Sequence, residues 1–297
     1  MPEPNVVSVA TSAALAAALE LARPGQCIQL ADGLYLGRFA SAASGTAGEP
    51  ITLSGSCKAV LSTGTIEAGY GLHLTGSHWI VRGISVSESA KGIVLDGSTH
   101  TVISGVDVGT IGAEGVHFRA GSSDGVIEDS VIHDTGLRLP GFGEGVYIGS
   151  ARGNWESVTG SAAVPDRSDR VIVRDNRISN TSAEGVDAKE GTTGGSITGN
   201  VFVNAGHSGV NSADSWVDIK GNGYVVSGNS GSSTRRDAFQ VHGVLPGWGL
   251  DNVFSHNVVE GGVPGYEVWV QSDSLRTVIT PGPSGAARGM SNIRCEG

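Results

Sequence analysis

The chain has 297 residues, of which 47 are glycine, and a net charge of −10. This charge argues against nucleic acid as a partner, because phosphate binding needs a basic face. It does not exclude an anionic ligand, since a local cluster of bases can outweigh a distant acidic surface. The length is near the limit for one globular core, so we expect residues 1–297 to form a single domain with an elongated, stacked core.

Residues 11–23 are predicted to form a short amphipathic helix, with Thr11 or Ser12 as the N-cap and a Pro-Gly pair as the stop signal. The stretch superficially resembles a signal peptide, but no basic region precedes it and Glu20 interrupts it. We therefore expect it to cover one end of the core. No segment is long enough to span a membrane, so we expect no membrane partner. Secretion is expected, through a signal removed before this sequence begins.

Three cysteines are present, Cys27, Cys57 and Cys295. Cys27 and Cys57 could form a disulfide across neighbouring turns, which would leave Cys295 without a partner. Their spacing does not match a zinc motif.

Internal repetition is the strongest signal in the sequence. A short segment that alternates apolar and variable residues recurs, at first about every 22 residues, as expected of a strand with one buried face. Its copies are residues 71–74, 92–95, 115–118, 145–148, 185–188, 216–219, 237–241 and 265–268.

A second repeat lies between these copies and consists of two strands around a tight polar bend. The bend is often Gly-Asn or Asp-Asn, where Asn and Gly accept left-handed backbone angles. Three strands per turn predict a right-handed, single-stranded parallel β-helix with three sheets, an all-β fold whose rungs share one core. A β-propeller would need Trp/Asp or Gly/His signatures at longer intervals, and the sequence lacks them.

Three stretches interrupt the rhythm, at residues 149–169, 203–215 and 243–250. Insertions in repeat proteins leave the core and usually collect on the binding face. We expect these three to do so.

Alternate residues of the first strand point outward and should stack from rung to rung. The first outward column is predicted to be His73, Val94, His117, Tyr147, Asp187, Asp218, Gln240 and Glu267. The second is predicted to be Thr75, Asp96, Arg119, Gly149, Lys189, Lys220, His242 and Trp269. Charged and aromatic columns cost stability through repulsion and desolvation unless something uses them, which favours a functional face.

Lys189 and Lys220 should lie on adjacent rungs, where like charge would lower the pKa of a lysine towards that of a useful base. Alternatively, Asp187 and Asp218 neutralise them in a surface ion-pair ladder. Tyr147 beside this pair is a credible proton donor. His117, Arg119 and His242 could bind sugar or simply be solvated. Glu114, Glu144 and Glu184 recur in a Glu-Gly-Val bend, where they are either site residues or acceptors for backbone N–H groups; the second interpretation is favoured for Glu114.

Over roughly residues 25–275 the rung pattern resembles the pectate-lyase-like β-helix superfamily. Residues 184–191, 218–222 and 237–242 look most like bacterial polysaccharide lyases, and among these the chain is similar to the family-31 alginate lyases. That resemblance implies that Tyr147 and Lys189 are the catalytic pair. Family-6 lyases pair a Lys with an Arg, where this chain has Lys220, and use calcium, for which no convincing carboxylate cluster appears. Family-28 hydrolases need three clustered Asp and a Gly-His-Gly element.

A lyase of this kind must neutralise the uronate carboxylate, remove the C5 proton and protonate the leaving oxygen. Arg119, Lys220 and His242 are candidates for the first task, Lys189 for the second and Tyr147 for the third, although the last two could exchange roles. The expected substrate-binding residues are His117, Arg119, Glu144, Glu184, Asp187, Asp218, Lys220, Gln240 and His242.

The expected activity is β-elimination on an acidic, alginate-like polysaccharide by a monomer without a cofactor, with calcium left open. Two alternatives remain. The first is a glycoside hydrolase of the same fold that uses Asp187 and Asp218 as its carboxylate pair. The second is a non-catalytic glycan-binding β-helix.

Overall fold

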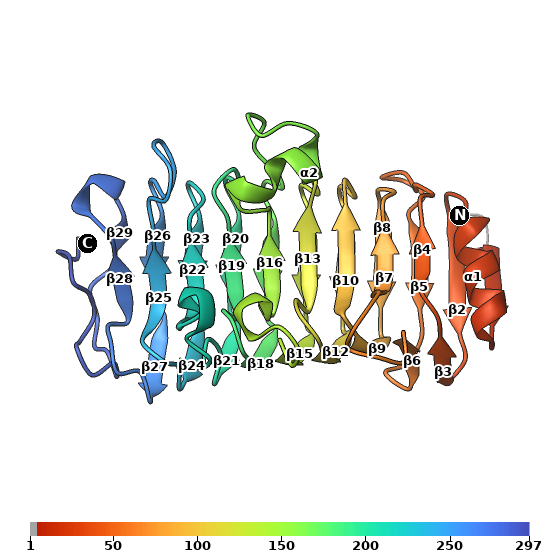
Figure 1. The fold of residues 1–297 in the computed structure, drawn as a ribbon, viewed down its shortest axis with the longest axis horizontal. Helices are drawn as coiled ribbons and strands as arrows, with labels where there is room; N and C mark the ends of the chain where they lie inside the picture. The colour runs from red at the N-terminus through yellow and green to blue at the C-terminus, as the bar shows by residue number, and fades with distance from the viewer. Residues whose placement is uncertain (1–4, 297) are drawn as a thin grey trace.

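The computed structural model describes residues 5–296, which wind into a right-handed parallel β-helix (Figure 1). Successive turns lie side by side along one axis, with the N-terminus and α1 at one end and the C-terminus at the other. Three parallel sheets of eleven, nine and nine strands form its walls, which we call sheets A, B and C. The predicted fold class is thereby confirmed.

Each sheet takes one strand from each successive turn. Sheet A contains β1 (Asn5–Val9), β2 (Gln26–Leu30), β5 (Ile51–Ser54), β8 (Trp79–Arg82), β11 (Val102–Ser104), β14 (Val126–Glu128), β17 (Ile172–Arg174), β20 (Ser196–Thr198), β23 (Val225–Ser227), β26 (Val253–Ser255) and β29 (Val278–Ile279). Sheet B contains β3 (Gly33–Leu36), β6 (Ala59–Ser62), β9 (Ser85–Ser89), β12 (Asp107–Ile111), β15 (Val131–Thr135), β18 (Arg177–Thr181), β21 (Val201–Val203), β24 (Ser230–Ser232) and β27 (Val258–Gly261). Sheet C contains β4 (Phe39–Ser41), β7 (Tyr70–Leu74), β10 (Lys91–Asp96), β13 (Val116–Arg119), β16 (Val146–Ile148), β19 (Val186–Ala188), β22 (Ser215–Ile219), β25 (Asp237–Val241) and β28 (Val268–Val270).

The helical elements are short and lie outside the coil. They are α1 (Ser12–Glu20), α2 (Trp155–Thr159) and the 3₁₀ turns η1 (Pro140–Phe142), η2 (Arg152–Asn154), η3 (Val210–Ser212) and η4 (Asp273–Leu275). No helix in residues 5–296 is both long and apolar enough to cross a membrane.

Inward-facing strand residues stack into one continuous core. In sheet A, for example, Val81, Ile103 and Ile127 are fully buried and pair in register across β8, β11 and β14. Because side chains alternate between the two faces of a strand, every second residue enters the core and the residues between face outward. This alternation fixes which side chains of sheet C can meet a ligand.

Helix α1 covers the N-terminal end of the core, as predicted (Figure 1). The backbone N–H of Ala14 donates to the Thr11 hydroxyl at 3.2 Å, so Thr11 is the N-cap. Leu15 and Leu19 are fully buried against the first turns. The Cys27–Cys57 pairing considered from the sequence is wrong, because all three cysteines are free.

The polar bends between sheets A and B hold a buried row of asparagines. The left-handed residues of these bends are Asp175, Gly199, Gly228 and His256. The residues that follow them are Asn176, Asn200, Asn229 and Asn257. The side-chain amide of each of the first three donates to the side-chain oxygen of the next asparagine at 3.0 Å. The sequence-based expectation that these asparagines take left-handed angles is therefore wrong, since their role is a hydrogen-bonded stack.

Replacing Asn200 by alanine is expected to lower the free energy of unfolding by about 2–4 kcal/mol, because it leaves buried amide groups of its neighbours without partners. Asn200 accepts from both the backbone and the side chain of Asn176 and donates to Val173 and Asn229. Thermal and denaturant unfolding measure the change. The matched control is Asn5→Ala, which removes an exposed amide on strand β1 and should change stability little. Equal stability of the two variants would contradict a structural role for the stack.

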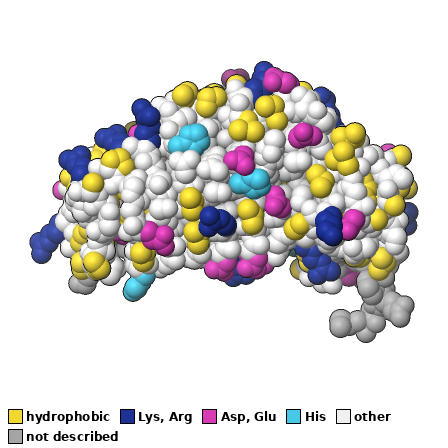
Figure 2. All heavy atoms as spheres, turned by 90° about the horizontal axis from the view of Figure 1, so that it is seen from below, with side chains coloured by type: hydrophobic (Ala, Val, Ile, Leu, Met, Phe, Trp, Pro, Cys, Tyr) yellow, Lys and Arg dark blue, Asp and Glu magenta, His cyan; other side chains and the backbone are white. Residues whose placement is uncertain are grey.

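The charged side chains of the outer surface are mixed rather than segregated. Seen from below, basic and acidic side chains are interspersed among hydrophobic ones over the visible face (Figure 2). Elsewhere on the surface, at sheet A and the bends that lead into it, charges are paired across rungs, for example Arg174 with Glu128 and Arg170 with Asp124. The face seen in Figure 2 therefore offers no single-sign patch of the kind that recruits a polyanion.

Candidate active site

The strand register of sheet C places the predicted first outward column in one line. Pairing runs from His73 through Val94 and His117 to Tyr147, Asp187, Asp218, Gln240 and Trp269. The prediction is wrong at the last position, where Trp269 and not Glu267 lies in the first column. Trp269 was expected in the second column. Strand β28 starts at Val268, so Glu267 precedes it and is buried. Trp269 lies beside His242, with ring centroids 5.1 Å apart.

Two adjoining cavities of about 330 and 300 Å³ lie over β13, β16, β19 and β22. Both are lined by Glu144, Ala151, Lys189 and Asn211, so they form one groove, which we call the sheet C groove. The structure brings most of the predicted site residues to this groove. They are His117, Arg119, Glu144, Tyr147, Glu184, Asp187, Lys189, Asp218, Lys220 and His242.

The walls of the groove come from the three insertions, as expected. Asn154 and Val158 belong to the first insertion, Asn211 to the second and Val244 to the third. The first two insertions flank sheet C, with α2 above β13 and β16 and η3 near the opposite ends of the strands (Figure 1).

A contact between η1 and η3 was not foreseen from the sequence. The Asn211 amide donates to the Gly141 carbonyl at 3.2 Å, and the Ser208 hydroxyl donates to the Pro140 carbonyl at 3.1 Å. These two loops lie far apart in sequence, so only the stacking of rungs reveals that they join. Together they build one wall of the groove.

Alternating charges run along the groove floor. The two oxygens of Asp187 contact the ammonium groups of Lys189 and Lys220 at 2.5 and 2.8 Å. Asp218 contacts Lys220 at 2.6 Å and His242 at 2.8 Å. The register is therefore as predicted, with both lysines on one side. Of the two arrangements left open by the sequence, the structure shows the one in which Asp187 and Asp218 neutralise the lysines.

The pKa of Lys189 is raised, so the prediction of a lowered pKa is wrong. Burial alone would lower it, but the Asp187 carboxylate, aided by Glu144, outweighs burial. The pKa of Lys220 is raised in the same way, since Asp187 and Asp218 oppose its desolvation. Asp218 is also desolvated, yet Lys220 and His242 hold its pKa well below the usual range. At neutral pH both lysines are protonated, and Asp187 lies between them as their shared counter-ion.

Tyr147 lies between two other predicted site residues. Its ring centroid is 4.4 Å from that of His117, and the Lys189 ammonium lies 5.2 Å from the same ring. Burial, followed by the charges of Asp187 and Glu144, raises the pKa of Tyr147 well above its usual value. Its side chain is 8% exposed, so only an edge of this residue reaches the groove.

His117 is held in place by its neighbours. Its Nε2 lies 2.9 Å from the Gly149 carbonyl and therefore donates, while Nδ1 lies 3.6 Å from Glu114 Oε1. Burial, followed by the charge of Lys91, keeps the pKa of His117 well below its usual value. A neutral ring fixed in this way supports Tyr147 by packing.

Two glutamates of the Glu-Gly-Val bends form an acidic cluster with Asp187 in the lining of the groove. Glu144, Glu184 and Asp187 have oxygens within 4.8 Å of one another, and all three are buried. Burial, then Glu114 and Asp187, raise the pKa of Glu144 to about 8. Burial and Asp187 raise the pKa of Glu184 well above its usual range. The expectation that Glu114 caps backbone N–H groups is wrong, since it accepts from the Lys91 ammonium at 2.8 Å.

A calcium ion does not fit this cluster. Calcium takes six to eight oxygen ligands, chiefly ionised carboxylates, carbonyls and waters, whereas burial raises the pKa values of Glu144 and Glu184 and so favours their protonated forms. Both Asp187 oxygens are already held by ammonium groups. A metal there would have to displace two lysines from their counter-ion.

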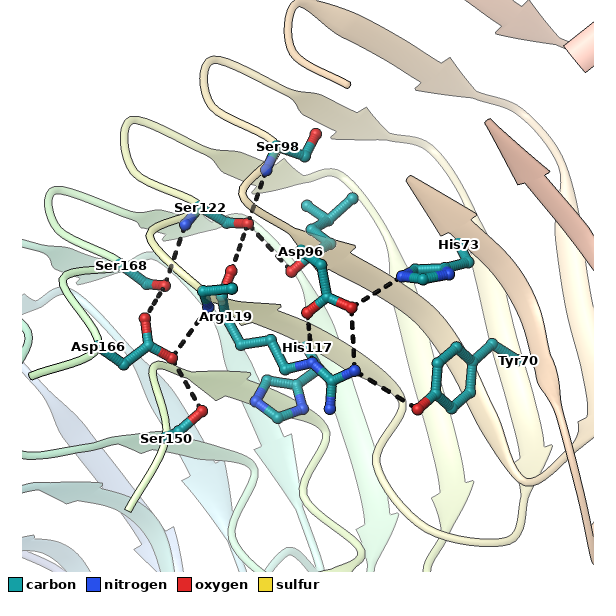
Figure 3. Close-up of polar contacts among 12 residues, drawn as sticks. Tyr70, His73, Asp96, Ser98, His117, Arg119, Ser122, Ser150, Asp166 and Ser168 are labelled. Atoms are coloured by element: carbon teal, nitrogen blue, oxygen red, sulfur yellow. Dashed lines mark hydrogen bonds and ion pairs between the residues drawn. The ribbon is translucent and has the colours of Figure 1, made fainter. Parts of the chain in front are cut away.

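The side chains of Arg119 and Gln240 are already bonded to neighbouring carboxylates. Arg119 pairs through Nε and Nη2 with Asp96, which also accepts from His73 at 2.8 Å (Figure 3). Gln240 donates to Asp214 at 2.7 Å and to Asp237 at 3.0 Å, and it lines neither cavity. The structure thus places Gln240 beneath the groove rather than in it.

The fold and groove define the class of protein. A family model for the right-handed β-helix region matches residues 41–162 and 70–243, and the chain belongs to this family. The structure is similar to that of an alginate lyase from Paenibacillus sp. str. FPU-7, with 38% identity, 98% of this chain and 96% of that chain covered, and a TM-score of 0.86.

More distant structures share the fold alone. A pectate lyase is 15% identical over 94% of this chain and 72% of its own, with a TM-score of 0.63. A lacto-N-biosidase from Eubacterium ramulus is 11% identical over 97% of this chain and 68% of its own, with a TM-score of 0.60. No curated protein sequence matches the chain significantly. Because the fold serves both lyases and a glycosidase, function has to be argued from the site.

Proposed function

We propose that the protein is a polysaccharide lyase that cleaves an alginate-like uronate polymer by β-elimination. The observation that carries the proposal is the juxtaposition of Tyr147 and Lys189 at the place where the two parts of the sheet C groove meet. The 38% identity with an alginate lyase supports the polymer class. We also propose that it acts as a secreted monomer, since such polymers lie outside cells.

The protonation state of Lys189 favours it as the acid, which leaves Tyr147 as the base. Asp187 keeps the Lys189 ammonium protonated, so Lys189 enters the reaction with a proton to give. The Tyr147 phenolate would take the C5 proton, the C5–H electrons would form the C4–C5 double bond, and the bond from C4 to the leaving oxygen would break. Lys189 would then protonate that oxygen, which balances the reaction. These roles are the reverse of those first expected from the sequence, which had Lys189 as the base and Tyr147 as the acid but left their exchange open.

Neutralisation of the substrate carboxylate is assigned to Glu144. Arg119, Lys220 and His242, the sequence-based candidates, already pair with Asp96, Asp187 or Asp218. Glu144 lines both parts of the groove, and its Oε2 is buried and has no partner within residues 5–296, so a small rotation of the side chain would present it to the substrate. A protonated carboxyl group can share its proton with a uronate carboxylate, which would stabilise the charge that develops after C5 deprotonation.

Glu144→Gln is expected to preserve activity at neutral pH and to remove a loss of affinity at alkaline pH. The pKa of Glu144 is raised to about 8, so the wild-type side chain donates a proton below pH 8 and becomes an anion that repels the substrate above it. KM for the polymer should therefore rise above pH 8 in the wild type only, since glutamine is a donor at every pH. Initial rates between neutral and alkaline pH measure this. Identical KM profiles for both enzymes would contradict the assignment.

The hydrolase alternative fits the site less well. A glycosidase of the usual type needs one carboxyl group that is protonated at working pH. Asp187 binds two ammonium groups, and the pKa of Asp218 is held well below its usual range. Neither is suited to donate a proton to a leaving sugar.

A screen of polymers tests the substrate class. Alginate, pectate, glucuronan, chondroitin and heparin are incubated with the enzyme, and the ultraviolet absorbance of unsaturated uronate is followed. We expect a signal with alginate. Absorbance from a different polymer would reassign the substrate, and binding without products from any of them would favour the non-catalytic alternative.

A further inference from the structure

Another cavity on sheet C lies beyond the sheet C groove, towards the N-terminal end. It has a volume of about 340 Å³ and is lined by Arg38, Phe39, Ala40, Gly69, Tyr70 and His73. Strand β7, which carries Tyr70 and His73, is three strand steps from β16, which carries Tyr147. At the usual spacing this separation is roughly 14 Å. The cavity therefore lies on the line that a polymer crossing the sheet C groove would follow.

Asp96 holds two side chains of this cavity in place, His73 directly and Tyr70 through Arg119 (Figure 3). Asp96 accepts from His73 at 2.8 Å and binds Arg119, whose Nη2 also donates to the Tyr70 hydroxyl at 3.4 Å. The rings of Tyr70 and His73 meet edge to face, with centroids 5.3 Å apart. Burial raises the pKa of Asp96, but its bonds with His73 and Arg119 outweigh burial and hold that pKa well below the usual range. The network fixes the two rings without using the Tyr70 hydroxyl proton.

Arg38 is the unpaired charge at this place. It is exposed, and none of the ion pairs among residues 5–296 includes it. Two other arginines near sheet C, Arg119 and Arg236, have carboxylate partners. A guanidinium group binds carboxylates through two parallel hydrogen bonds, and aromatic rings offer an apolar face to a sugar ring.

We propose that Arg38, Tyr70 and His73 form a remote subsite that binds the carboxylate and ring of a uronate residue several sugars from the cleaved bond. This inference rests on the proposed function, since it takes the same polymer as ligand. The subsite contacts none of the reacting atoms. Its contribution is to hold long chains in register, so it should matter for polymers and not for oligomers too short to reach it.

The test compares Arg38→Ala with wild type on alginate and on short oligouronides prepared from it. We expect KM for the polymer to rise about tenfold, the usual effect of losing one charge-assisted interaction, with kcat unchanged. Kinetics on the short oligomers should stay the same. The matched control is Arg82→Ala on β8, which removes another exposed arginine outside sheet C. An unchanged KM for polymer, or an equal loss on both substrates, would overturn the subsite.

A binding measurement separates this inference from the proposed function. Calorimetric titration of alginate into Lys189→Ala, with and without Arg38→Ala, needs no turnover. Weaker binding in the double variant supports the subsite, whether or not the wild type cleaves the polymer. A wild type that cleaves no polymer would refute the lyase assignment but not the subsite. Equal affinity of the two proteins would overturn the subsite even if the wild type is an active lyase.

Discussion

Replacing Lys189 by alanine is expected to lower turnover on the polymer by roughly two to four orders of magnitude, as is usual when a general acid or base is removed. The ammonium group lies 2.5 Å from Asp187 and beside the Tyr147 ring. Lys189→Arg should restore little activity, because a guanidinium group releases its proton far less readily than an ammonium group. Initial rates on alginate measure both variants.

A substrate with a good leaving group tests whether Lys189 is the acid. A uronate that carries fluoride at C4 needs no proton on the departing group, so Lys189→Ala should cleave it at nearly the wild-type rate. If Lys189 were the base, the variant would fail on this substrate as well.

The fold of Lys189→Ala has to be checked, because the lysine is less exposed than its sequence suggested. Its side chain is 14% exposed and neutralises Asp187 together with Lys220. Circular dichroism and a thermal melt show whether the variant is folded, and Lys58→Ala, which removes an exposed lysine, is the control. Near-normal turnover of Lys189→Ala on alginate would refute a catalytic role.

Replacing Tyr147 by phenylalanine is expected to cause a loss of similar size, again roughly two to four orders of magnitude. The change removes one oxygen and leaves the ring between His117 and Lys189. The fluoride substrate should not rescue this variant, since C5 deprotonation is still required. The matched control is Tyr266→Phe, which removes a hydroxyl group from a ring stacked on Arg288 at the C-terminal end.

The pH dependence of the wild type should report on the same tyrosine. Burial, together with Asp187 and Glu144, raises the pKa of Tyr147, so the phenolate fraction increases with every step of pH through the alkaline range. kcat should therefore rise from neutral to alkaline pH, in contrast to the loss of affinity expected from Glu144. A kcat that falls as the pH rises above neutrality would contradict a tyrosine base.

The fold could be predicted from the sequence because the repeat encodes it directly. Each rung repeats one alternation of buried and exposed residues, and a register error would expose a whole strand. This is why Tyr147, Asp187 and Asp218 were placed in one column correctly. The error at Glu267 arose in the last rung, where an apparent match of Gly265-Tyr-Glu-Val to earlier segments is shifted by two residues from the true strand.

The sequence left the electrostatics of the site open between two lysines that lower each other's pKa and two lysines neutralised by Asp187 and Asp218, because the choice depends on distances across rungs. Lys189 and Lys220 were correctly placed as neighbours, but their ammonium groups turn to the two oxygens of Asp187, which reverses the sign of the pKa shift. The same holds for the η1–η3 contact, where Asn211 reaches Gly141 from a distant loop. The asparagine stack, in contrast, had a visible signal in the repeated Gly-Asn and Asp-Asn bends.

The products formed in water labelled with heavy oxygen test the central claim most directly. β-Elimination adds no water, so after a short digest followed at once by borohydride reduction, which stops oxygen exchange at the reducing end, mass spectrometry should show unlabelled fragments. The new non-reducing ends should carry a C4–C5 double bond by NMR. Hydrolysis would place the label in the products and form no double bond. Unlabelled, unsaturated products that depend on Tyr147 and Lys189 are the result predicted here, and labelled, saturated products would contradict it.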